Sequence, residues 1–174
     1  MNKETILVLA RYNKAVNEKM LDIIKTLSPA EWEKNLGGYL SSVQSLCTHT
    51  YIGDYNWLKR FGNLRNFTVL GESFFSRDAI SFKEALFPDM KEYLSKRPEL
   101  DEKLISFANE VNDGDMKNTF KYTDSRGGVN EKNFGICAIQ CFTHGIHHRA
   151  MVSIYLELLG RPNDFSTMQN LDLL

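Results

Sequence analysis

Apolar residues recur at every third or fourth position along most of this chain, a spacing that builds one continuous stripe along an α-helix. Near the N-terminus the stripe is formed by Ile6, Leu9, Val16, Met20, Ile23, Ile24 and Leu27. Alternation of apolar and polar residues, the pattern of a half-buried strand, is limited to a short stretch around Phe120. These periods predict an all-α fold.

Capping signals set the limits of the first helices. The sequence SPAE, beginning at Ser28, has the form of a capping box with proline at the first helical position, and it predicts a short helical turn. A second capping pattern, Ser41 with Gln44, predicts a helix that ends near Gly62. Residues 63–80 are rich in Asn, Gly and Ser and are expected to form a long loop.

A third helical pattern extends from about Ser81 to Val111. It contains Pro88 and Pro98, and because proline has no backbone N–H this helix is expected to be kinked or interrupted. The following stretch NTFKYTDSRGGVNEKNF changes period and predicts a small hairpin, with an irregular connector as the alternative.

A last, strongly apolar helix is expected over residues 133–159, because Gly160 and Pro162 follow it as stop signals. Four long helices favour a four-helix bundle over any layered sheet fold. With 174 residues, of which 43% are hydrophobic, the chain is expected to form one domain over residues 1–174.

Charge and cysteine content narrow the functional classes. The chain has 21 basic and 22 acidic residues, so no basic excess favours nucleic acid or anionic lipid as a partner. The N-terminal apolar run is short and is broken by Arg11, which predicts neither a signal peptide nor a membrane span, and hence a cytoplasmic protein. Cys47, Cys137 and Cys141 are expected to be buried hydrophobic residues rather than redox groups.

Three of the four histidines lie within CFTHGIHHRAM, and the fourth is His49. On a helix, His144 and His148 fall within the apolar stripe, whereas His147 turns to its side and Arg149 points away from its centre. A further set shares that stripe with the two histidines: Cys137, Cys141, Met151, Val152, Tyr155, Leu158 and Leu159. His49 shares an apolar face with Trp57 and is also expected to turn inward.

Histidines spaced i, i+4 on one helix can both bind one ion, with bonds of about 2.0–2.1 Å. A single buried histidine is more often satisfied by hydrogen bonds, but three clustered imidazoles favour a divalent metal ion. We therefore expect His49, His144 and His148 to be metal ligands and His147 not to be one. The metalloprotease motif H-E-x-x-H is absent, because Gly145 takes the place of its glutamate.

Three segments resemble helices of the DinB/YfiT-like family of metal-dependent four-helix bundles: RYNKAVNEKMLDIIKTLSPAEW, LGGYLSSVQSLCTHTYIGDYNWLKRF and FTHGIHHRAMVSIYLELLGRP. The resemblance covers nearly the whole chain and places the family's ligand triad on His49, His144 and His148. It implies an up-down-down-up bundle, usually a homodimer, with a metal in a pocket open to solvent. The family commonly reads H-R-G-Q where this chain reads HRAM, so the likeness does not extend to substrate contacts near Ala150 and Met151.

The resemblance also implies chemistry close to that of thiol S-transferases acting with low-molecular-weight thiols. We expect a metal-dependent transferase or hydrolase that uses Ni²⁺, Zn²⁺ or Mn²⁺ and a small-molecule substrate. No catalytic base stands out; Gln140 and Tyr155 are the nearest polar candidates, and both are more simply residues at the edge of the core. The alternative is a non-catalytic metal-binding protein of the stress response, but a structural zinc site would normally have a fourth ligand, which neither Cys47 nor Cys141 offers.

Asp54 and Arg60 match the family's D-x-x-W-L-x-R pattern, and Arg149 directly follows a predicted ligand. The alternative for all three is a set of ion pairs on helix surfaces, which contribute little to stability. The two tryptophans, Trp32 and Trp57, are expected to be core aromatic residues.

Overall fold

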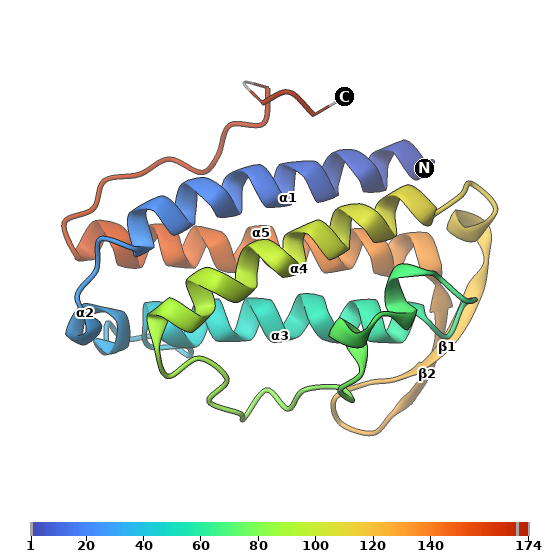
Figure 1. Ribbon diagram of the computed structural model, residues 1–174, viewed down its shortest axis with the longest axis horizontal. Helices are drawn as coiled ribbons and strands as arrows, with labels where there is room; N and C mark the ends of the chain where they lie inside the picture. Colours follow the sequence, from blue (N-terminus) through green and yellow to red (C-terminus); the bar gives the residue numbers. More distant parts are fainter. Residues whose placement is uncertain (1, 170, 174) are drawn as a thin grey trace.

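A computed structural model describes residues 2–169 and 171–173, and these residues are mostly helical (Figure 1). The α-helices are α1 (Lys3–Ile24), α2 (Pro29–Glu33), α3 (Val43–Phe61), α4 (Met90–Glu110) and α5 (Phe134–Leu158). Short 3-10 helices η1 (Val69–Gly71), η2 (Ser73–Phe75) and η3 (Asp115–Lys117) lie in the connections. Strands β1 (Thr119–Thr123) and β2 (Val129–Asn133) pair antiparallel as the predicted hairpin, so the irregular connector is wrong.

The long helices lie side by side. α1 packs against α4 and α5, and α3 packs against the same two helices. Figure 1 shows α1 and α5 running in one direction and α3 and α4 in the opposite one, with α2 at one end of the molecule and the hairpin at the other. Among the helices of the described residues, none has an apolar stretch long enough to cross a bilayer.

Side-chain caps begin these helices largely where the sequence predicts. Ser28 and Glu31 form the expected capping box of α2. At α3 the box is formed by Ser42 and Ser45, one residue later than expected, because the carbonyl of Ser41 accepts a hydrogen bond from the amide of Leu36 and closes the preceding turn.

Helix α4 differs from its predicted form. It begins at Met90, with Asp89 as its N-cap. The sequence predicts a helix from about Ser81, but residues 81–89 are not helical. Proline restricts the residue before it to extended backbone, and Pro88 therefore delays the helix. Pro98 does not interrupt α4, which continues to Glu110. Proline removes one backbone hydrogen bond, and the buried residues on both sides of Pro98 keep the helix packed.

The core has an aromatic cluster at the hairpin end of the molecule. The ring of Phe61 stacks on Phe107 with centroids 5.3 Å apart and meets the edge of Phe134 at 5.1 Å. At the opposite end the buried Trp32 packs against Tyr93, as a core aromatic residue should. All three cysteines, Cys47, Cys137 and Cys141, are buried and free, which confirms the prediction for them.

Candidate metal site

The structure brings the three predicted histidines together between α3 and α5. Nε2 of His144 lies 3.2 Å from Nε2 of His49 and 3.1 Å from Nε2 of His148. One nitrogen from each residue lies within 4.8 Å of the other two, so the three side chains can share one ion. His147 is exposed and does not belong to this group.

Helix geometry and one glycine position these rings. His144 and His148 are one turn apart on α5, and their rings meet edge to face with centroids 4.4 Å apart. On the facing helix, a Cβ at Gly53 would lie 2.8 Å from Cε1 and 3.1 Å from Nδ1 of His144. Only a residue without a side chain lets the His144 imidazole lie this close to the backbone of α3.

Phe82 covers the third histidine. Its ring packs against that of His49 with centroids 4.7 Å apart and an interplanar angle of 35°. Phe82 remains 38% exposed. It also lines a cleft of about 220 Å³ that reaches His49 along α3, past Thr48 and Ser45. A small molecule can therefore approach His49 beside this aromatic ring.

The segment that carries Phe82 is tied to α3 at both ends. The amide side chain of Asn56 exchanges two hydrogen bonds of 2.8 Å with the backbone of Ile80. At the other end, Nε2 of Gln44 donates to the carbonyl of Phe87 at 3.1 Å. The segment 81–86 is thus held over the histidines by side chains of the helix that carries His49.

The three imidazoles are neutral at physiological pH. Burial lowers the pKa of His49 to about 4, with a further contribution from His144. Burial and the neighbouring imidazoles lower the pKa of His148 to about 3. Burial also lowers the pKa of His144. A neutral imidazole keeps one nitrogen lone pair free, which is the state that binds a metal ion.

The donor set fits a divalent ion. Nitrogens bound tetrahedrally at about 2.1 Å from one ion lie roughly 3.4 Å apart, close to the 3.1 and 3.2 Å observed. Hydrogen bonds among the three rings cannot satisfy all of their nitrogens. Nε2 of His144 faces two other imidazole nitrogens, and it can carry only one proton. Nδ1 of His144 and of His148 are buried without a hydrogen-bond partner in the part of the chain that the structure describes, so packing holds these rings.

Within the described residues, no carboxylate or thiolate joins the three histidines as a fourth ligand. Cys141 is buried with its Sγ 3.9 Å from Oδ1 of Asp54, and burial raises the pKa of its thiol. Burial likewise raises the pKa of Cys47 to about 12, so this cysteine stays a neutral thiol. A three-nitrogen site of this kind leaves coordination positions for an external ligand.

A buried ionic network lies behind the site, and it contradicts the alternative of a surface ion pair at Asp54. Asp54 accepts a hydrogen bond of 2.8 Å from Arg97, which also binds Asp101 at 2.6 Å, and all three side chains are almost fully buried. Asn13 and Asn17 of α1 donate to Asp101 at 2.9 Å. The network therefore connects α1, α3 and α4.

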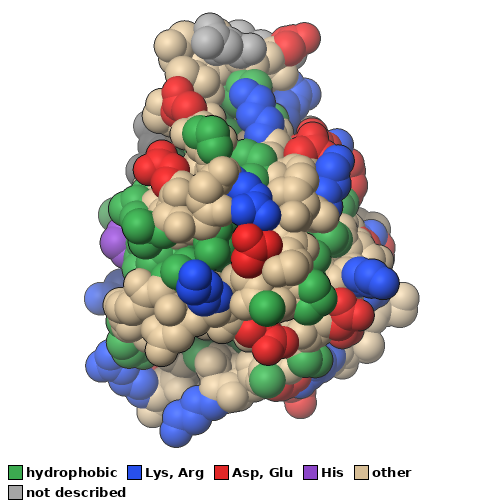
Figure 2. Space-filling view, turned by 90° about the vertical axis from the view of Figure 1, so that its left-hand side faces the viewer, with side chains coloured by type: hydrophobic (Ala, Val, Ile, Leu, Met, Phe, Trp, Pro, Cys, Tyr) green, Lys and Arg blue, Asp and Glu red, His purple; other side chains and the backbone are tan. Residues whose placement is uncertain are grey.

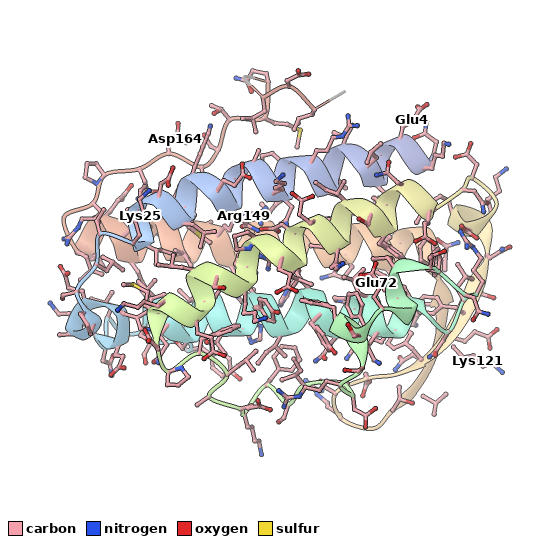
Figure 3. All side chains as sticks on the ribbon, in the orientation of Figure 1. Glu4, Lys25, Glu72, Lys121, Arg149 and Asp164 are labelled. Carbon is pink, nitrogen blue, oxygen red and sulfur yellow. The ribbon has the colours of Figure 1, made fainter. Side chains whose placement is uncertain are left out.

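Arg149 is also buried, with 3% of its surface exposed, so its expected place away from the centre of the apolar stripe and its alternative place in a surface ion pair are both wrong. Its Nη1 donates to the side-chain oxygens of Asn13 and Asn17. Figure 3 shows Arg149 among the long helices. Conversely, Leu158, expected on the buried face, is 63% exposed.

The remaining sequence candidates have other roles. The hydroxyl of Tyr155 donates to the carbonyl of Leu40 at 2.9 Å, which fixes the loop before α3 and removes this residue as a free acid or base. Gln140 is exposed. Arg60 is half-buried, with its guanidinium carbon 4.9 Å from the ring centre of Trp57, which packs at the edge of the core.

The fold and the site together define a helical protein with a candidate three-histidine metal centre between two of its long helices. The model of the DinB family matches residues 1–169, and the chain belongs to this family. A comparison with curated proteins finds no match.

Proposed function

We propose that His49, His144 and His148 bind one divalent metal ion, and that the protein is a metal-dependent enzyme of the thiol S-transferase or hydrolase type. The convergence of three neutral imidazole nitrogens with no fourth protein ligand among the described residues supports this proposal. Ni²⁺, Zn²⁺ and Mn²⁺ are the candidate ions, and imidazole ligands favour the first two.

A divalent ion supplies Lewis acidity, which lowers the pKa of a thiol or water molecule bound to it. The residues of the chain provide the surroundings. The two histidines of α5 and His49 hold three nitrogens in place, and Phe82 and the apolar core limit access of bulk water to them. In such surroundings charges interact more strongly than in water, which favours formation of an anionic nucleophile.

In the transferase form of this proposal, a low-molecular-weight thiol loses its proton and its sulfur forms a bond to an electrophilic carbon. The leaving group departs with the electron pair of the broken bond. Because no side chain at the site is an evident general base, we propose that the proton passes to solvent through the cleft beside His49.

We further propose that the long helices form the up-down-down-up bundle of the family and that the outer face of α5 forms a homodimer in the cytoplasm. Ile136, Ile146, Ile154 and Leu158 are exposed large hydrophobic residues on this helix. Figure 2 shows apolar side chains gathered around a histidine at the left margin of its view. Sedimentation analysis should give a dimer, and Ile154→Glu should shift it to a monomer.

Metal analysis of the purified protein, followed by thiol-consumption assays, tests the enzymatic proposal. Loaded protein should consume a thiol in the presence of a model electrophile faster than free metal does. Chelator and His144→Ala should both abolish this rate. Metal binding without thiol consumption across a panel of thiols and electrophiles would instead favour the non-catalytic alternative.

A further inference from the structure

A second cleft, also lined by Phe82, lies between residues 79–83 and the hairpin. Its volume is about 410 Å³, and Arg60 of α3 and Thr123 of β1 line it together with Lys83. Phe82 and Lys83 also line the smaller cleft that reaches His49. The two clefts are therefore neighbours that share Phe82, the residue whose ring packs against His49.

Arg60 is a half-buried cation whose contacts within the described residues are aromatic. Its guanidinium carbon lies 4.9 Å from the ring centre of Trp57 and 5.6 Å from that of Tyr122. The two ring centres are themselves 5.6 Å apart, so the guanidinium lies in the corner that they form. The rings fix its position and leave its other sides free to donate hydrogen bonds.

The carboxylate nearest in the cleft lining, Asp124, is already used by the hairpin turn. Its Oδ1 accepts hydrogen bonds from the amides of Arg126 and Gly128 at 2.9 and 3.0 Å. Its Oδ2 accepts one from Asn130 at 3.1 Å. Asp124 therefore stabilises the turn. Among the described residues it forms no salt bridge with Arg60, although its charge partly offsets the lowering of the Arg60 pKa by burial.

Lys83 adds a second cation to this cleft. It is exposed, and it forms no ion pair within residues 2–169 and 171–173. The adjacent carboxylate, Glu84, is paired with Arg77 instead. The lining of the cleft thus has two cations, Arg60 and Lys83, against the one carboxylate of Asp124. Burial of the Arg60 guanidinium makes an external anion favourable there.

We propose that this cleft binds a carboxylate or phosphate group of a small molecule whose remaining part extends past Phe82 toward His49. The cleft would then be the anion-binding part of the substrate site, an assignment that rests on the proposed function for the reacting end. The class of substrate that follows is a small organic anion with its reactive centre separated from the charged group by the width of an aromatic ring.

The indole N–H signal of Trp57 can report anion binding in the metal-free wild-type protein. We would record the indole N–H signals of both tryptophans by NMR while adding succinate or inorganic phosphate at constant ionic strength. The Trp57 signal should move in a saturable way, because an anion on Arg60 changes the charge next to this ring. Trp32 is buried at the opposite end and should not move, which makes it an internal control.

Arg60→Gln should abolish the movement, and Lys83→Gln should weaken the affinity about tenfold or more. Arg126→Gln is the matched control, because it removes the same charge from the exposed hairpin turn and should change neither the signal nor the affinity. An unchanged Trp32 signal shows that each variant is folded. Preference between succinate and phosphate identifies which anionic group the cleft takes.

An immobile Trp57 signal, or equal loss of affinity in Arg60→Gln and Arg126→Gln, would overturn the proposal. Because the titration is performed without metal, its outcome is separate from that of the metal site. Anion binding by a wild-type protein that takes up no divalent ion would retain the cleft and refute the metal centre. Metal binding by a wild-type protein whose Trp57 signal stays immobile would do the reverse.

Discussion

Gly53 of α3 lies directly against the imidazole of His144 on α5, and a Cβ at this glycine would approach Cε1 to 2.8 Å. The position of one predicted ligand therefore depends on a missing side chain on the opposite helix. Gly53→Ala should displace the His144 ring and weaken metal binding by on the order of tenfold or more.

Isothermal titration with Zn²⁺ or Ni²⁺ measures this effect. Gly71→Ala is the matched control, because a Cβ there would meet no atom within 4 Å. An unchanged affinity in Gly53→Ala would show that the His144 ring has room to move without losing the ion.

Removal of His148 should abolish metal binding, whereas removal of its neighbour His147 should leave it nearly intact. His148 contributes one of three converging nitrogens, and His147 is exposed outside the group. Metal content after dialysis of His148→Ala and His147→Ala compares the two. Equal losses of bound metal in both variants would contradict the assignment of His148, rather than His147, as a ligand.

The metal-free protein should lose stability as the pH falls below about 6.5. Folding lowers the pKa of His49 to about 4 and that of His148 to about 3, from an ordinary value of 6.5. The unfolded state therefore binds protons first, and the stability present above pH 6.5 is progressively lost toward pH 3. After allowance for solvent screening, the loss by pH 4.5 should be on the order of 2 kcal/mol.

Urea unfolding of the metal-free protein between pH 7.5 and 4.5 measures this dependence. His148→Gln should flatten the curve, because the substituted side chain does not titrate. A wild-type stability that stays constant across the range would contradict the predicted protonation states.

Arg97→Met should lower the free energy of unfolding by about 3–5 kcal/mol, because it leaves the carboxylates of Asp54 and Asp101 buried without their cation. The neighbouring Lys96 forms an exposed pair with Glu99, and Lys96→Met should change stability by less than about 1 kcal/mol. Thermal or urea unfolding of the two variants gives the comparison. Similar small effects in both would mean that the buried carboxylates are neutral.

Helical periodicity was sufficient to predict the histidine cluster, because His49, His144 and His148 occupy stripes whose direction follows from residue spacing alone. It was not sufficient for the orientation of every residue on α5. Apolar residues cover nearly all sides of this helix, so the centre of its buried face is poorly defined. Arg149 and Leu158 were therefore assigned to the wrong sides.

The buried network escaped prediction for a different reason. Arg97 and Asp101 stand one turn apart in the stripe that contains Tyr93 and Leu104, and polar residues in such positions read as gaps in the pattern. The signal was nevertheless present: opposite charges spaced i, i+4 within an apolar stripe can be buried as a pair. The late start of α4 could also have been predicted from the sequence, because Pro88 restricts the backbone of the residue before it.

The two ends of segment 81–86 are tied to Asn56 and Gln44, both on the helix that bears His49. The cover over the candidate metal centre is thus attached by side chains that are not themselves ligands. New sequences or lengths between these two attachment points could alter which molecules reach the ion while the histidines keep their positions. Diversification of substrate preference and conservation of the metal centre can proceed independently in such an arrangement.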